Sequence, residues 1–271
     1  MDNRPIGVFD SGMGGLTTVR ALAKQLPAED IVYFGDTGRV PYGGRPQETI
    51  VRYARQDVAF LRTFDLKAVV IACGTVSSAA LGVLSAEQDI PIFGVVGPTA
   101  LRAAQVTRNN KIGLIATAAT VRTGAYERIM RHANPMAEIT SLACPLFVPL
   151  VENGRTQPGD IVIETVVREY LTPLKEKGID TLVLGCTHYP LLKDVIGAFM
   201  GPEVTLLDSG AEVVRQVAER LSASGQEADP GREGRCRWYV SDSTEGFQSL
   251  ASLFLGRPVT EPVEQISIED Y

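Results

Sequence analysis

The sequence has few of the residues that most metal sites and disulfide scaffolds need. Its 271 residues include two histidines, one tryptophan and four cysteines. No two cysteines form a CxxC pair. This usage fits neither a small disulfide-stapled domain nor a zinc ribbon. We therefore expect reduced thiols and no bound metal.

An excess of positive charge and long apolar runs are also missing. The chain has 26 Lys and Arg against 32 Asp and Glu, for a net charge of −6. Basic residues do not cluster with aromatic ones, so we expect no nucleic-acid partner. No apolar run approaches the roughly 20 residues of a membrane span, and the first residues lack the apolar core of a signal peptide. These absences predict a soluble cytoplasmic protein with no membrane partner.

The hydrophobic content of 45% is enough to build large cores, and its spacing indicates an α/β protein. In the first part of the chain, short apolar runs alternate with helix-like stretches, which is the βαβ rhythm of a parallel sheet. Strands are expected at 6–9, 31–34, 67–72 and 90–95, and helices at about 15–25, 47–64 and 76–86.

The pattern then restarts. We expect strands at 111–115, 180–185 and 204–207, helices at about 120–132, 159–177 and 191–200, and a less regular region at 137–153. A helix to about 222, a polar loop at 224–234, a strand at 235–240 and a helix at 244–255 complete the chain. The last two elements are too small to fold alone, so we expect them to pack on the first part.

The two parts resemble a diverged repeat. Ile6-Gly7-Val8 matches Ile112-Gly113-Leu114 at an offset of 106, and Cys73 matches Cys186 at an offset of 113. We therefore predict two similar open, mainly parallel α/β domains related by pseudo-two-fold symmetry. Residues 1–96 plus 208–271 form the first and residues 97–207 the second, with the active site in the crevice between them.

Cys73 and Cys186 carry most of the functional information. Each ends a short apolar run, as a buried parallel strand does where it emerges at its carboxyl end. Open α/β sheets bind ligands at that edge. A single cysteine there is most often a packing residue, but two in matching contexts predict thiols that face each other across the crevice. Cys144 and Cys236 have no such context, and we interpret both as structural.

Two facing thiols suit the inversion of an amino acid at its α-carbon. Inversion needs one group that removes the α-hydrogen from one face and another that returns a proton to the opposite face. A sulfur is a base as thiolate and an acid as thiol, so the same pair runs both directions. A free cysteine with a pKa of about 8.5 is only a few per cent thiolate at neutral pH. Neighbouring groups must therefore tune each sulfur.

Five ordered motifs resemble those of the glutamate racemases. They are Phe9-Asp10-Ser11-Gly12-Met13-Gly14-Gly15, Gly35-Asp36-Thr37 with Pro41-Tyr42-Gly43, Ala72-Cys73-Gly74-Thr75, Pro149-Leu150-Val151-Glu152 and Gly185-Cys186-Thr187-His188-Tyr189-Pro190. The resemblance implies a cofactor-independent enzyme that interconverts L- and D-glutamate and supplies D-glutamate for peptidoglycan. It makes Cys73 and Cys186 the two acid/base residues. Homodimers are common in that family.

The resemblance also assigns three supporting residues. Asp10 assists proton transfer at Cys73, His188 assists Cys186, and Glu152 holds or charges His188. Each residue also has a simpler interpretation: Asp10 as a helix cap, His188 as a structural histidine and Glu152 as a solvated carboxylate. A protonated imidazole near a thiol would lower the thiol pKa, in agreement with the assigned role.

Substrate contacts follow from the resemblance too. The implied ligands are Asp10, Ser11, Tyr42, Gly43, Gly74, Thr75, Thr117, Thr120, Thr187 and His188. The threonines all follow strand ends, where they would otherwise cap helices, and their hydroxyls can donate to a carboxylate or accept from an ammonium. One departure stands out: many members of the family carry Asn after the first cysteine, and this chain has Gly74. We expect its substrate affinity or side-chain preference to differ.

Other functions remain open at this point. A racemase of the same superfamily could act on aspartate or another small substrate. Cys73, Cys186 and His188 could bind zinc, although clustered ligand spacing is missing. A homologue could keep the fold and lose catalysis, although no cysteine is missing here. A dinucleotide site is not expected, because Thr17 stands where the third glycine of the fingerprint would be, and no lysine suits pyridoxal phosphate.

Overall fold

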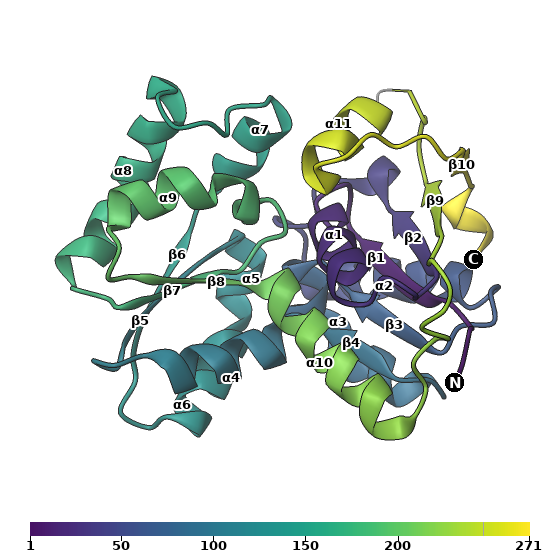
Figure 1. The fold of residues 1–271 in the computed structure, drawn as a ribbon. Helices are drawn as coiled ribbons and strands as arrows, with labels where there is room; N and C mark the ends of the chain where they lie inside the picture. Colours follow the sequence, from purple (N-terminus) through teal and green to yellow (C-terminus); the bar gives the residue numbers. More distant parts are fainter. Residues whose placement is uncertain (246) are drawn as a thin grey trace.

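The protein folds around two separate parallel sheets that form two lobes side by side (Figure 1). The structure is a computed structural model and describes residues 1–245 and 247–271. The larger sheet has the strand order β10-β9-β2-β1-β3-β4, and the smaller has the order β6-β5-β7-β8. Every strand pairing found among the described residues is parallel. This agrees with the α/β class expected from the sequence.

The first sheet takes its strands from both ends of the chain. Its elements are β1 (Ile6–Asp10), α1 (Leu16–Gln25), β2 (Ile31–Gly35), the 3₁₀ helix η1 (Thr37–Arg39), α2 (Gln47–Leu61), β3 (Ala68–Ile71), α3 (Gly74–Glu87), β4 (Ile92–Gly94), β9 (Cys236–Val240), α11 (Phe247–Leu255), β10 (Val263–Gln265) and the 3₁₀ helix η3 (Ile268–Asp270). The expected final strand pairs with β2, so the end of the chain does pack on the first part. Gly246, within the helix expected at 244–255, lies outside the described residues.

The second sheet is built from the middle of the chain. Its elements are β5 (Lys111–Ala116), α5 (Ala118–Thr123), α6 (Ala125–Ala133), β6 (Glu138–Ala143), α7 (Phe147–Glu152), α8 (Ile161–Glu176), β7 (Thr181–Leu184), the 3₁₀ helix η2 (Tyr189–Leu192), α9 (Lys193–Met200) and β8 (Thr205–Asp208). Two further helices complete the fold: α4 (Val96–Val106) follows β4, and α10 (Ser209–Ser224) follows β8.

The strand orders reveal the repeat directly. In the first sheet β2-β1-β3-β4 are neighbours in that order, and in the second β6-β5-β7-β8 follow the same order. The strands matched by sequence offset, β1 with β5 and β3 with β7, therefore occupy equivalent places. Cys73 and Cys186 follow equivalent strands as a result.

Two expectations for the middle of the chain are wrong. The helix expected at 120–132 is two helices, because Gly124 adopts the left-handed conformation with φ of 60° and ends the first of them. The region 137–153 is not irregular, since it contains β6 and α7. β6 is an edge strand whose residues are mostly half-exposed, so its sequence shows no strong apolar run.

Helix α4 and strand β10 were not expected at all. α4 starts directly after β4 without a side-chain cap at its N-terminus. It packs against α6, α10 and β7, whereas α10 packs against α1 and α4. We therefore propose that the chain passes between the lobes close to residues 96 and 208, as the sequence suggested.

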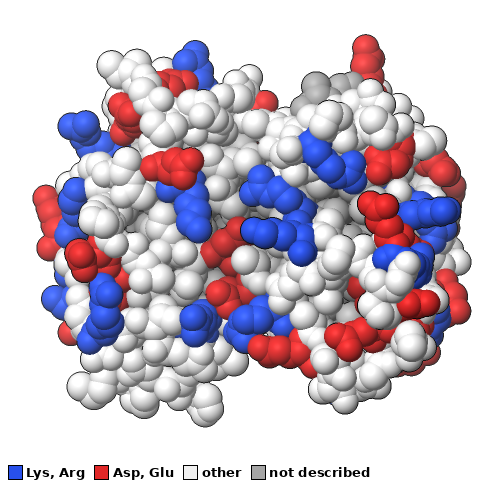
Figure 2. Space-filling view, in the orientation of Figure 1, with Lys and Arg blue, Asp and Glu red and all other residues white. Residues whose placement is uncertain are grey.

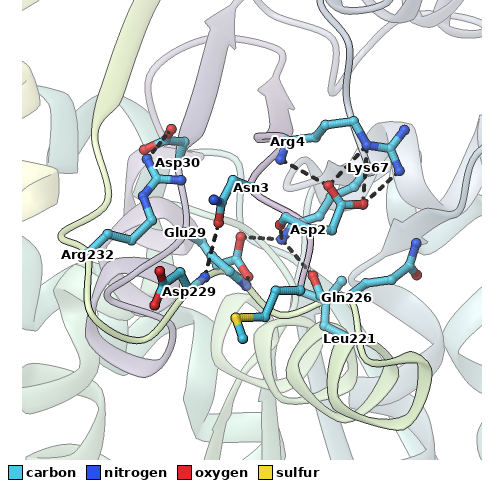
Figure 3. Close-up of polar contacts among 12 residues, drawn as sticks. Asp2, Asn3, Arg4, Glu29, Asp30, Lys67, Leu221, Gln226, Asp229 and Arg232 are labelled. Atoms are coloured by element: carbon cyan, nitrogen blue, oxygen red, sulfur yellow. Dashed lines mark hydrogen bonds and ion pairs between the residues drawn. The ribbon is translucent and has the colours of Figure 1, made fainter.

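A buried ion pair ties the segment after α10 to the residue that precedes β3 in the first sheet (Figure 3). The Lys67 Nζ lies 2.5 Å from a Glu29 carboxylate oxygen, and both side chains are almost fully buried. The same Nζ donates to the backbone carbonyls of Asp2 and Gln226, at 2.7 and 2.8 Å. The other Glu29 oxygen accepts from the Ala228 N–H at 2.9 Å. One lysine thus joins four separate stretches of chain.

Charged side chains of both signs are interspersed over the face shown in Figure 2. That face has no extended patch of one sign. Among the described residues, none of the helices combines the length and apolar character that crossing a membrane requires.

Candidate active site

Cys73 and Cys186 line one cavity of about 550 Å³. Cys73 directly precedes α3 as its N-cap residue, and Cys186 follows β7 by two residues. Both thiols are buried, with 5% and 7% of their residues' surface exposed. The lining residues are Asp10, Ser11, Gly12, Val40, Pro41, Tyr42, Gly43, Gly44, Cys73, Gly74, Thr75, Thr117, Ala118, Cys144, Pro145, Val148, Pro149, Glu152, Gly185, Cys186, Thr187, His188 and Tyr189.

That list contains all but one of the residues expected at the site. Thr120 is not among the residues that line the cavity, but its hydroxyl lies 3.0 Å from that of Thr117. Thr117 in turn lies 2.9 Å from the Thr75 hydroxyl on the opposite lobe. The three threonines therefore form one chain of hydroxyls that crosses from α5 to α3. Thr117 also caps α5 by accepting the Thr120 N–H, so capping and a place in the cavity are compatible.

Cys73 sits beside two groups from the loop after β1. Its Sγ donates to the Ser11 Oγ at 3.3 Å. Burial and the nearby Asp10 carboxylate raise the pKa of Cys73 to about 12. A pKa raised this far favours the thiol form of Cys73.

Asp10 is a buried carboxylate with free acceptor capacity. One oxygen accepts the Gly12 N–H at 3.1 Å, whereas Oδ1 has no hydrogen-bond partner among the described residues. Burial raises the pKa of Asp10, and the positive charge of His188 and backbone N–H groups oppose the rise. Asp10 does not cap α1, whose N-cap residue is Gly15. The unpartnered Oδ1 can therefore accept a hydrogen bond or a proton.

His188 connects Cys186 to a carboxylate. Its Nδ1 lies 3.9 Å from the Cys186 Sγ, and its Nε2 lies 2.9 Å from a Glu152 oxygen. Burial disfavours the imidazolium, but the contacts with Cys186 and Glu152 outweigh this effect and raise the pKa of His188 to about 10. Glu152 comes from α7, so the second lobe alone supplies this group of three. The histidine is positioned to hold a proton near the Cys186 sulfur.

Hydrogen bonds join the lobes around the cavity. The Ala119 N–H donates to the Gly43 carbonyl at 2.9 Å. On the other side, the Thr17 hydroxyl lies 3.0 Å from the Thr187 carbonyl, to which it can donate. Together with the contact between Thr75 and Thr117, these bonds hold the loops that carry the two cysteines against each other.

Tyr42 lines the cavity, but its hydroxyl is bonded to a buried carboxylate pair. It donates to Asp36 and lies 3.4 Å from Asp57. Arg39 pairs with both carboxylates, at 2.6 and 2.9 Å. Burial and the neighbouring Asp36 raise the pKa of Asp57 well above its usual range. This network fixes the loop that presents Gly43 to the cavity, so the structure gives the Tyr42 hydroxyl a structural partner.

The backbones of the two cysteine loops meet at Gly74. A Cβ added there would lie 2.4 Å from the Gly185 carbonyl oxygen, which is far inside van der Waals contact. A Cβ at Gly14 would lie 2.2 Å from the Thr187 Oγ1 and 2.6 Å from the His188 Nδ1. At both places the lobes approach so closely that a side chain would force neighbouring atoms to move. The sequence showed that position 74 lacks Asn, but it did not show that the backbone of Gly185 lies against this position.

Sequence reasoning missed several residues of the cavity. Cys144, interpreted as structural, lines it, although burial raises the pKa of Cys144 to about 12. The apolar wall formed by Val40, Pro145 and Val148 had no signal that separated it from ordinary loop residues. No group of three or more His, Cys, Asp or Glu side chains in the described ranges is placed to hold a metal ion.

Comparisons with known proteins bear on this geometry. Residues 6–217 match the family model described as Asp/Glu/Hydantoin racemase. A curated glutamate racemase from Geobacter metallireducens is 46% identical over 266 residues, covering 98% of this chain and 97% of that protein.

Solved structures agree. A glutamate racemase isoform from Bacillus anthracis superposes with a TM-score of 0.92 at 36% identity, over 98% of each chain. The glutamate racemase of Francisella tularensis, solved in complex with D-glutamate, gives 0.91 at 36% identity and full coverage of both chains.

Proposed function

This chain belongs to the Asp/Glu/hydantoin racemase family, and we propose that it is a glutamate racemase that uses Cys73 and Cys186 to interconvert L- and D-glutamate. The product D-glutamate serves peptidoglycan synthesis, which is the general role of these enzymes. Three relatives that are 44–46% identical to this chain, and that align with nearly all of it, are named glutamate racemases.

One observation carries the proposal. The two thiols follow equivalent strands of the two sheets and line the same cavity, with Asp10 near Cys73 and His188 near Cys186. A substrate held between them presents opposite faces of its α-carbon to the two sulfurs. One sulfur, as thiolate, removes the α-hydrogen as a proton and leaves its electron pair on carbon. The other, as thiol, donates its proton to the opposite face, so the protonation states of the sulfurs are exchanged after each turnover.

The first sulfur needs a group that takes its proton, because the pKa of Cys73 is raised to about 12. Asp10 is suited to this role, since the residue lines the cavity and its buried Oδ1 has no other partner among the described residues. The positive ammonium of a bound amino acid would favour both anions and so lower both pKa values. Substrate binding thereby activates the Cys73 side.

The positive partner of the second sulfur, Cys186, is the imidazole of His188. A His188 that remains protonated near neutral pH stabilises a Cys186 thiolate, and Glu152 balances the charge of the imidazolium. The two halves of the site therefore differ: an aspartate serves one sulfur and a histidine and glutamate pair serves the other. Both directions of the reaction use both halves.

Substrate recognition relies on neutral donors. The lining residues include no Lys or Arg. The carboxylates of glutamate would therefore bind to hydroxyls such as those of Ser11, Thr75 and Thr187 and to backbone N–H groups near Gly43. An ammonium would face Asp10. Aspartate, the closest alternative substrate, has the same groups on a shorter side chain.

The test is incubation of the wild type with each enantiomer of glutamate and of aspartate in deuterated water. Chiral analysis reports inversion, and mass spectrometry reports deuterium at the α-carbon. We expect inversion with exchange for glutamate, and loss of turnover in Cys73→Ser and Cys186→Ser. Cys236→Ser, on strand β9 and away from the cavity, is the matched control and should retain activity.

Two results would overturn the proposal. Exchange with aspartate but not with glutamate would show that aspartate is the substrate. Undiminished turnover in either cysteine variant would show that the reaction does not need both thiols. A homodimer and a cytoplasmic location stay predictions from the sequence, to be examined by light scattering and cell fractionation.

A further inference from the structure

His188 is contacted by an aromatic ring from the last helix of the chain. The ring of Phe254, in α11, lies with its centroid 5.1 Å from that of His188, and the two planes meet at 87°. Phe254 is completely buried. An edge-to-face pair at this distance is a favourable aromatic contact. The same histidine also contacts Cys186 and Glu152.

The helix that supplies this ring is anchored on the other lobe. α11 packs against α1. At its start, Phe247 lies 6.4 Å, centroid to centroid, from Trp238 of β9. In Figure 1 α11 lies on the side of the first lobe that faces α7 and α9 of the second. His188 therefore receives its carboxylate partner from its own lobe and its aromatic contact from the lobe that carries Cys73.

The orientation of the imidazole ring decides whether both of its contacts exist. Nδ1 must point to the Cys186 Sγ while Nε2 points to Glu152, and the first of these distances is already 3.9 Å. A rotation of the ring plane would lengthen both contacts. Gly14 lies so close to the imidazole that a Cβ at position 14 would come within 2.6 Å of the His188 Nδ1. The ring of Phe254 bounds the imidazole in a perpendicular plane.

We propose that Phe254 is a positioning residue that fixes the ring of His188, and through the contact of that ring with Cys186 governs proton transfer at this sulfur. This inference rests on the proposed function. Phe254 is not among the cavity-lining residues, so it touches no substrate. Helix α11 thus helps to position the histidine beside Cys186.

The test compares Phe254→Leu with Phe247→Leu. Both change a buried phenylalanine of α11 to a smaller apolar residue, but only the first contacts His188. Phe254→Met is a second variant in case the leucine variant folds poorly. The equilibrium constant of racemisation is one, so kcat/KM falls equally in both directions for any variant. An effect on proton transfer at only one of the two sulfurs is instead measured from the primary isotope effects of α-deuterated L- and D-glutamate.

Reference variants define each side. Asp10→Asn should raise the isotope effect for the enantiomer that Cys73 deprotonates, and His188→Asn should raise it for the other. We expect Phe254→Leu to reduce kcat/KM roughly 2- to 10-fold. It should raise the same isotope effect as His188→Asn and leave the other unchanged. Phe247→Leu should lower Tm without altering either isotope effect.

Two outcomes would overturn the inference. In one, Phe254→Leu and Phe247→Leu give the same isotope effects as the wild type. In the other, Phe254→Leu raises both isotope effects. Failure of the proposed function looks different, because the wild type itself would then neither invert glutamate nor exchange its α-hydrogen.

Discussion

Replacing Gly74 with alanine should slow racemisation, because the two cysteine loops leave no room for a methyl group. The new Cβ would lie 2.4 Å from the Gly185 carbonyl oxygen, whereas ordinary contact begins at 3.4 Å. The obstructing atom is backbone, and the Gly185 N–H is itself bonded to the Ile115 carbonyl at 2.8 Å. The loops must therefore separate by about 1 Å. Cys73 and Cys186, the immediate neighbours in sequence, would move with them.

A misplacement of about 1 Å at a reacting group can cost on the order of 100-fold in rate. We expect kcat/KM to fall between about 10- and 100-fold and the free energy of unfolding to fall by about 1–3 kcal/mol, as for other overpacked sites. Circular dichroism of the L-to-D conversion measures the first, and urea denaturation the second. Gly82→Ala is the matched control in the same helix, since nothing lies within 4 Å of its added Cβ.

Gly82→Ala should keep full activity and gain up to about 1 kcal/mol, because alanine favours an exposed helix interior. Gly74→Asn carries the same clash and adds an amide that can reach substrate. If Gly74→Ala retains wild-type kcat/KM, the close approach of the loops does not set the separation of the thiols, and the reasoning fails. If Gly74→Asn exceeds Gly74→Ala in kcat/KM by lowering KM, the amide partly compensates through substrate binding.

Three further outcomes follow from buried polar groups. Lys67→Met leaves Glu29 buried and unpaired, so urea denaturation should show a loss of about 3–5 kcal/mol, with KM unchanged; a loss below about 1 kcal/mol contradicts the role of the pair. Tyr42→Phe removes a donor from the Asp36 carboxylate and should cost about 1–3 kcal/mol by the same assay, whereas a neutral result would mean that another donor replaces the hydroxyl. The pKa of His188 is raised from 6.5 to about 10, so its stabilising contribution is complete below pH 6.5 and is lost as pH rises to about 10. The difference in unfolding free energy between wild type and His188→Gln should shrink over that interval, and a constant difference would argue against the raised pKa.

The sequence predicted the strands that carry the cysteines because both are buried parallel strands with continuous apolar runs. β3 and β7 lie in the interior of their sheets, where both faces are covered. The edge strand β6 has no such run, and it was missed. α4 was missed because neither a cap nor an acidic first turn marks its start. The break at Gly124 needed a backbone conformation that one glycine in a helical pattern does not reveal.

The site could be predicted only in part, for a related reason. The offset of the repeat indicated that Cys73 and Cys186 would face each other, because both follow equivalent strands. The pairing of His188 with Glu152 joins residues 36 positions apart, and only the family resemblance suggested it. Phe254 carried no signal, since one phenylalanine in an apolar helix looks like any core residue. Contacts between lobes are properties of the folded chain that no local pattern encodes.

The burial of Cys73 also bears on the survival of the enzyme under chemical stress. Peroxides and electrophiles react with thiolates far faster than with thiols. With its pKa raised to about 12 and 5% of the residue's surface exposed, Cys73 has almost no thiolate at neutral pH. An oxidant in the surrounding solution therefore meets an inert side chain. The burial that raises the pKa of Cys73 therefore also protects this thiol from oxidation.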